Sequence, residues 1–162
     1  MTHREFDKPL ELDLSNEKAS EQFGNQLAGW LMPPLVLTFS GDLGAGKTTI
    51  IRAMLKSLGV ESSIKSPTFS LVESYNCNKI QIHHFDLYRI HHPEELDYLG
   101  FRDYFSKESI CCIEWPEHAD TQLSEVDLCF KLSSTGAGRH IQITASSVAG
   151  QRILTGLVGE SI

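Results

Sequence analysis

The first third of the chain combines a short alternating segment with two helix-type patterns. Residues Glu11 to Leu14 alternate acidic and apolar side chains, which predicts a short strand. Ser15 or Asn16 can cap the helix that follows, and Pro33 and Pro34 are expected to end it. Its apolar residues recur at spacings near four and are predicted to be buried: Ala19, Phe23, Leu27 and Trp30.

A second strand and helix follow directly. Leu35 to Ser40 is a run of β-favouring residues that ends at Gly41, and a helix is predicted from about Lys47 with Gly59 as its C-cap. The apolar positions of that helix are Ile50, Ile51, Met54, Leu55 and Leu58.

The remaining chain alternates strand and helix patterns. An extended stretch from Ser66 to Tyr75, a turn at 76–78 and a strand from Lys79 to Leu87 predict an antiparallel pair. A helix is expected after Pro93, with the core-facing residues Leu96, Leu99, Phe101, Tyr104 and Phe105. The last predicted elements are a doubly buried strand at Ser109 to Trp115, strands at Asp127 to Leu132 and Arg139 to Ala145, and a helix from about Ala149 to Leu157. We therefore expect a three-layer α/β domain with a mixed sheet, parallel at its centre.

Composition limits this architecture to one domain. A chain of 162 residues with 41% apolar content can bury one ordinary core, so we expect a single domain over residues 1–162. No run approaches the roughly 18 apolar residues of a membrane span, which predicts a cytoplasmic protein without membrane contact. A net charge of -7 disfavours a broad nucleic-acid surface.

The four cysteines predict reduced thiols. None forms a Cys-x-x-Cys pair, and adjacent Cys111 and Cys112 on a strand would point to opposite faces. His83 and His84 would likewise face opposite ways, and no further ligand type is spaced with them to complete a zinc site.

The segment between the second strand and helix carries the clearest chemistry. It reads Gly-Asp-Leu-Gly-Ala-Gly-Lys-Thr from Gly41 to Thr48, the pattern of a phosphate-binding P-loop. Glycines allow the backbone N–H groups to approach a phosphate, and the following helix directs its positive end there. Lys47 is expected between the β- and γ-phosphates, and the Thr48 hydroxyl is expected on Mg²⁺.

A P-loop site also needs an acidic group near the metal, and two candidates fit. Asp86 and Glu114 each follow an apolar strand, and the more apolar run before Glu114 favours a central strand beside the loop. Which carboxylate lies nearer the metal stays open. Arg89 could pair with Asp86 or reach a phosphate, and Trp115 could be core, a nucleotide platform or an interface anchor.

Five ordered motifs stand out along the chain, at 41–49, 66–72, 84–89, 94–100 and 113–117. Together they resemble the TsaE (YjeE) family, the ATPase component of bacterial tRNA threonylcarbamoyladenosine synthesis. The resemblance covers nearly the whole chain, with one slight departure, since Phe69-Ser70 stands where many members have Tyr-Thr.

The resemblance implies a small P-loop ATPase that joins the partners TsaB and TsaD, meets tRNA only through them, and uses ATP with Mg²⁺ to reset the complex. It implies that Lys47 holds phosphates, that Thr48 and Glu114 ligate Mg²⁺, and that Asp86 assists at the metal or positions water. The implied nucleotide contacts are Ser20, Gly41, Asp42, Leu43, Gly44, Ala45, Gly46, Lys47, Thr48, Thr49 and Arg139. The implied switch or partner residues are Ser66, Pro67, Thr68, Phe69 and Trp115.

Two other classes compete with this reading. A small-molecule P-loop kinase is possible in a short α/β chain, although the arginines are scattered rather than gathered in a lid. A scaffold that binds nucleotide without hydrolysing it is the third class.

Overall fold

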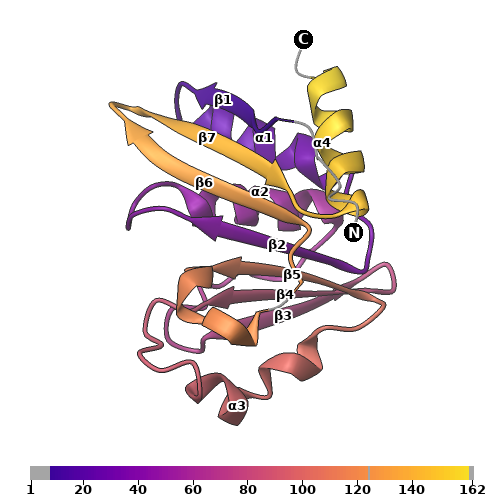
Figure 1. The fold of residues 1–162 in the computed structure, drawn as a ribbon. Coiled ribbons are helices and arrows are strands. Elements are labelled where there is room, and N and C mark those ends of the chain that lie inside the picture. Colours follow the sequence, from indigo (N-terminus) through magenta and orange to yellow (C-terminus); the bar gives the residue numbers. More distant parts are fainter. Residues whose placement is uncertain (1–7, 124, 161–162) are drawn as a thin grey trace, which may run out of the picture.

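The computed structural model describes residues 8–123 and 125–160, which form one seven-stranded sheet with helices packed against it (Figure 1). The strands are β1 Leu10–Leu14, β2 Leu35–Ser40, β3 Val72–Cys77, β4 Ile80–Asp86, β5 Ser109–Glu114, β6 Leu128–Thr135 and β7 Gly138–Ala145. The α-helices are α1 Glu17–Ala28, α2 Lys47–Leu58, α3 Glu95–Leu99 and α4 Val148–Glu160. Three short 3₁₀ helices are η1 Phe101–Tyr104, η2 Pro116–His118 and η3 Asp120–Gln122.

The sheet is parallel at its centre and antiparallel at both sides, as predicted. Its order is β1-β7-β6-β2-β5-β4-β3. Strand β2 pairs in parallel with β5 and β6, and β4 pairs in parallel with β5. Strands β1, β7 and β3 join through antiparallel pairing. Because β2, β5 and β4 run in parallel, their carboxyl ends meet at one edge of the sheet.

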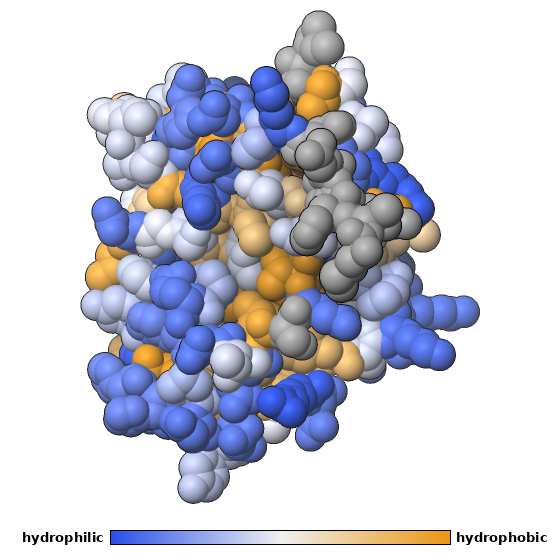
Figure 2. All heavy atoms as spheres, in the orientation of Figure 1, coloured by the Kyte–Doolittle hydropathy of each residue, from blue (hydrophilic) through white to orange (hydrophobic). Residues whose placement is uncertain are grey.

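The two faces of the sheet are covered unequally. Helices α1, α2 and α4 pack on one face over the larger core, which contains Phe39, Phe130 and Met54 (Figure 1). The other face carries a smaller core around Phe85, Leu96 and Phe101, built by α3 and η1. The third layer of the predicted architecture is therefore present but consists of short helices. Figure 2 shows a polar rim on the face seen in Figure 1, with apolar residues exposed near its middle.

Several predicted boundaries need correction. Helix α1 ends at Ala28, before the prolines, and Trp30 lies outside it with 37% of its surface exposed. Residues 68–70 form a turn, so the strand predicted from Ser66 begins only at Val72. The hairpin turn lies at Asn78 and Lys79, both with positive φ, rather than at 76–78. The predicted helix after Pro93 is split at Gly100, which adopts φ 70°.

The cysteine predictions are confirmed for the described residues. Cys112 lies in the larger core and Cys111 in the smaller one, on opposite faces of β5. All four cysteines are free thiols. Among the described residues, no helix has the length and apolar content to cross a membrane.

Candidate nucleotide-binding site

The loop between β2 and α2 has the backbone of a phosphate-binding loop. Gly41, Gly44 and Gly46 have φ of 141°, 79° and 99°, which residues with a side chain rarely adopt. A Cβ on Gly41 would lie 2.3 Å from the Leu132 carbonyl oxygen, whereas a Cβ on Gly44 would meet nothing within 4 Å. Space therefore stays open in front of Gly44, where the loop's N–H groups could receive an anion.

A cavity of about 270 Å³ lies in front of this loop. Small-molecule sites usually measure roughly 300–1,000 Å³, so this cavity suits a phosphate chain better than a whole nucleotide. Its lining residues are Leu43, Gly44, Ala45, Gly46, Lys47, Thr48, Thr49, Thr68, Asp86, Glu114, Trp115 and Arg139. The structure thus gathers most of the predicted site residues from five separate segments of the chain.

Lys47, the first residue of α2, is buried and turned back onto its own loop. Its Nζ donates to the carbonyl oxygens of Gly41 and, at 3.4 Å, of Asp42. The same nitrogen lies 4.1 Å from the centroid of the Trp115 ring. Burial lowers the pKa of Lys47, and the carboxylates of Glu114 and Asp86 oppose that shift.

Thr48 and Glu114, the two residues that the resemblance implies as Mg²⁺ ligands, lie in direct contact. The Thr48 hydroxyl donates to Glu114 Oε1 over 3.1 Å, joining the start of α2 to the end of β5. Hydroxyl and carboxylate oxygens are the hard ligands that Mg²⁺ prefers. The donor set and the open loop together fit a Mg²⁺–nucleotide complex.

Asp86 lies beside Glu114, because the two residues are partners in the parallel register of β4 and β5. Its carboxylate accepts from the Thr68 hydroxyl at 3.3 Å and from the Tyr88 N–H at 3.0 Å. Of the two carboxylates that the sequence left as alternatives, Glu114 is the one that contacts Thr48.

The Ser66 to Phe69 segment reaches the site through Thr68. The Ser66 and Thr68 hydroxyls are 2.7 Å apart, and Thr68 continues the chain of contacts to Asp86. Phe69 points outward with 84% of its surface exposed, and the Arg89 guanidinium lies 5.3 Å from its ring centroid.

Trp115 packs against the smaller core but is only half-buried, so the core role that the sequence favoured holds only in part. It adopts φ 59° directly after β5, is half-buried, and lines the cavity. Its ring also lies 5.0 Å from that of Tyr88. The positive φ ends the strand at Glu114 and turns the indole towards Lys47.

Two predicted contacts for the base side of a nucleotide differ in their placement. Arg139 lines the cavity, where its Nε would lie 3.1 Å from a Cβ added to Gly46. Ser20 is buried in α1 and does not line the cavity, so its nucleotide contact stays a prediction.

Sequence reasoning missed His84. Its Nε2 lies 2.6 Å from Glu114 Oε2, and both side chains are buried. A signal was present: alternation along β4 puts His84 on the same face as Asp86, two residues later. His83 faces the other way, towards the Tyr104 ring and the Ser74 hydroxyl, as predicted. Among the described residues no group of three or more His, Cys, Asp or Glu side chains is arranged to hold a metal by itself.

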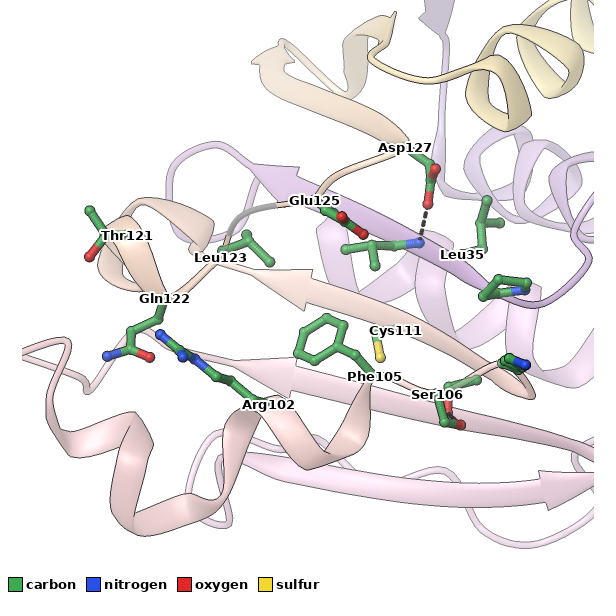
Figure 3. Close-up of a pocket in the computed structure, with 14 residues that line it drawn as sticks. Leu35, Arg102, Phe105, Ser106, Cys111, Thr121, Gln122, Leu123, Glu125 and Asp127 are labelled. Atoms are coloured by element: carbon green, nitrogen blue, oxygen red, sulfur yellow. Dashed lines mark hydrogen bonds between the residues drawn. The ribbon is translucent and has the colours of Figure 1, made fainter.

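A second cavity, of about 680 Å³, lies over the smaller-core face of the sheet and extends from the first residues of β2 and β5 to η1 and η3 (Figure 3). Phe105 and Cys111 lie at its centre, with Arg102 and Gln122 at one end. No residue of the predicted site lines it. A choice by cavity volume alone would therefore have missed the cavity in front of the glycine loop.

The mixed sheet, the glycine loop and the Lys47–Thr48–Glu114 arrangement together define a P-loop NTPase fold. The crystal structure of Bacillus subtilis YdiB superposes on this chain with a TM-score of 0.79 at 27% identity, covering 96% of this chain and 97% of that one.

Comparison with protein families identifies the particular group. The family model described as threonylcarbamoyl adenosine biosynthesis protein TsaE matches residues 14–141. The Haemophilus influenzae protein named tRNA threonylcarbamoyladenosine biosynthesis protein TsaE is 40% identical over 147 residues, 88% of this chain and 93% of the relative. The Bacillus subtilis protein of the same name is 32% identical over 139 residues, 85% of this chain and 87% of the relative. The chain belongs to the TsaE family.

Proposed function

We propose that this protein binds and hydrolyses ATP with Mg²⁺ as a cytoplasmic subunit of the machinery that makes threonylcarbamoyladenosine in tRNA. The observation that carries the nucleotide part is that the glycine loop, Lys47 and the Thr48–Glu114 pair border one cavity. The family relationship and the names of the relatives support the biosynthetic part. Residues 1–162 act in this proposal as one P-loop NTPase domain.

Each side chain has a distinct task in this proposal. The loop N–H groups and the start of α2 hold the β-phosphate, and Lys47 leaves the Gly41 carbonyl to bind the β- and γ-phosphates. Thr48 and Glu114 would hold Mg²⁺, and the ion would supply positive charge beside the phosphoryl oxygens. Asp86 assists at the metal or orients the attacking water, and Arg139 and Ser20 contact the base side of the nucleotide. Since the cavity suits phosphates, the base would lie outside it.

The partners in this proposal are TsaB and TsaD, and tRNA is contacted only through them. The net charge of -7 supports an indirect role, because direct RNA binding relies on cationic side chains. Phe69 is exposed and Trp115 is half-buried, and both lie beside the site, where a partner could contact them.

Ser66 to Phe69 acts as the switch in this proposal. Thr68 contacts Asp86, so a change at the carboxylate on nucleotide binding is transmitted to the neighbouring, exposed Phe69. The bound nucleotide would then determine whether this segment is ordered, and the ordered segment would control docking to TsaB and TsaD.

The test compares wild-type protein with Lys47→Ala, and Lys107→Ala serves as the matched control because Lys107 is exposed and lines the other cavity. Calorimetry measures Mg–ATP binding, phosphate release measures hydrolysis with and without TsaB and TsaD, and mass spectrometry of digested tRNA measures the modified nucleoside. Lys47→Ala is expected to weaken ATP binding by roughly 10- to 100-fold, the loss of a charge-assisted contact, and to abolish modification. Full modification by Lys47→Ala would overturn the proposal.

The same assays separate the other classes. A kinase would yield a phosphorylated metabolite from a cell extract, a result the family relationship does not favour. A non-hydrolysing scaffold would return its ATP intact after incubation with TsaB and TsaD. Release of inorganic phosphate with no phosphorylated metabolite supports the ATPase.

A further inference from the structure

The buried contact between His84 and Glu114 joins β4 to β5 directly beneath the loop. His84 Nε2 lies 2.6 Å from Glu114 Oε2, and the two side chains are only 1% and 3% exposed. The Thr48 hydroxyl donates to Glu114 Oε1 over 3.1 Å and lies 3.4 Å from Oε2. One carboxylate thus has a partner on each of its two oxygens, and these partners come from two different elements.

The direction of the His84 hydrogen bond follows from the carboxylate. Oε2 can only accept, so Nε2–H must donate to it, and the proton-bearing nitrogen of the imidazole is thereby fixed. His84 Nδ1 is buried and has no partner among the described residues, so Glu114 is the polar group that this side chain serves.

A hydrogen bond to Oε2 limits rotation of the Glu114 carboxylate. Rotation about the last side-chain bond of a glutamate is otherwise broad. With Oε2 held by His84, Oε1 stays directed at the Thr48 hydroxyl, the other oxygen of the proposed metal position. Partners of metal-binding carboxylates orient them in this way, and losing such a partner typically costs roughly 10- to 100-fold in metal affinity.

We propose that His84 is a positioning residue that sets the affinity of the nucleotide site for its divalent cation by orienting Glu114. This inference rests on the proposed function, since it requires that Mg²⁺–nucleotide binds at the loop. It assigns His84 no contact with phosphate, which is left to Lys47 and the loop N–H groups. His84 should therefore matter for nucleotide binding with Mg²⁺ and not without it.

The experiment compares His84→Gln with His84→Asn. The amide nitrogen of Gln reaches about as far as Nε2 and can donate to Oε2, whereas the shorter Asn cannot. His83→Asn is the matched control, because His83 is also buried on β4 but faces Ser74 and Tyr104. A fluorescent ATP analogue is titrated at increasing Mg²⁺ and again in EDTA, and circular dichroism checks folding.

In His84→Asn, the Mg²⁺ concentration that gives half of the full increase in affinity for the analogue is expected to rise by roughly 10-fold or more. Binding of the analogue in EDTA is expected to stay unchanged. His84→Gln is expected to stay near wild type. An unchanged Mg²⁺ requirement in His84→Asn, or equal weakening with and without Mg²⁺, would overturn the inference. Failure of the wild-type protein to bind the analogue at all would instead count against the proposed function.

Discussion

The Lys47 ammonium lies 4.1 Å from the centre of the Trp115 ring, so the P-loop lysine and the residue that follows β5 contact one another. A lysine over an indole face is held by the negative charge of the ring's π system. Lys47 also donates to the Gly41 carbonyl, so its charge is satisfied within the protein. A phosphate chain would have to replace both contacts.

Nucleotide binding should therefore change the fluorescence of Trp115, because a positive charge leaves its ring. The protein has two tryptophans, so Trp30→Phe leaves Trp115 as the single reporter. Emission is expected to change and saturate as Mg–ATP is added. In Trp30→Phe/Lys47→Ala the free protein should already show altered emission, and nucleotide should change it little; an equal response in both variants would contradict the contact.

Gly24→Ala should destabilise the protein, because α1 and α2 cross closely at this glycine. An added Cβ would lie 2.7 Å from the Ile50 carbonyl oxygen and 2.8 Å from the Ala53 Cβ. Overpacking of this kind costs about 1–3 kcal/mol, or a fall of several degrees in Tm for a chain of this size. Thermal unfolding measures it.

Gly159→Ala is the control for that substitution, since it lies in α4 and its Cβ would meet nothing within 4 Å. It should leave Tm unchanged or raise it slightly, because alanine favours a helix over glycine. Equal Tm values for the two variants would show that α1 and α2 are not in tight contact at Gly24.

The sequence predicted the sheet, its parallel centre and the loop, because these depend on local patterns. Period-two alternation and the Gly41 to Thr48 motif are readable without knowing what packs where. The boundaries around Trp30 and Gly100 were missed because they depend on tertiary packing and on a positive φ at one glycine. Gly100 was a local sign that the helix ends there, but the apolar spacing at 96–105 continues past it and predicted one helix.

In the candidate site, too, the residues marked by local patterns were predicted and the contacts that depend on tertiary structure were not. Glu114 and Asp86 were found because each ends an apolar strand, and their adjacency follows from parallel pairing of β4 and β5. The contact of His84 with Glu114 was not predicted, because it depends on the register between these strands. Trp115 was ambiguous for a related reason: only the positive φ shows that it leaves the strand and turns to Lys47.

Cys111 should resist alkylation in the folded protein. Burial raises its pKa from 9.0 to about 12, which lowers the reactive thiolate fraction by roughly 1,000-fold. Cys112 is fully buried, and burial likewise raises its pKa well above 9.0. Brief iodoacetamide treatment and peptide mapping should find the half-buried Cys77 and Cys129 modified before Cys111 and Cys112. Modification of Cys111 at the same rate as Cys129 before unfolding would contradict the burial; denaturant should make all four thiols reactive.

His140 should stabilise the edge strand β1 in a pH-dependent way. Its Nδ1 lies 2.8 Å from Asp13 Oδ1 and its Nε2 lies 3.2 Å from Glu11 Oε1, and these hydrogen bonds, Asp13 first, raise the pKa of His140 above 6.5. A raised pKa means that the folded protein holds the proton more tightly, so the added stability is fully present below 6.5 and disappears as pH rises through the folded-state pKa. His140→Gln should therefore lower Tm relative to wild type at about pH 5.5, and the difference should shrink towards about pH 9.

Repeating both pH values in an Asp13→Asn, Glu11→Gln background should abolish that pH-dependent difference, because the carboxylates that favour the proton are gone. A Tm difference that is the same at both pH values in the wild-type background would show that His140 acts through packing rather than charge.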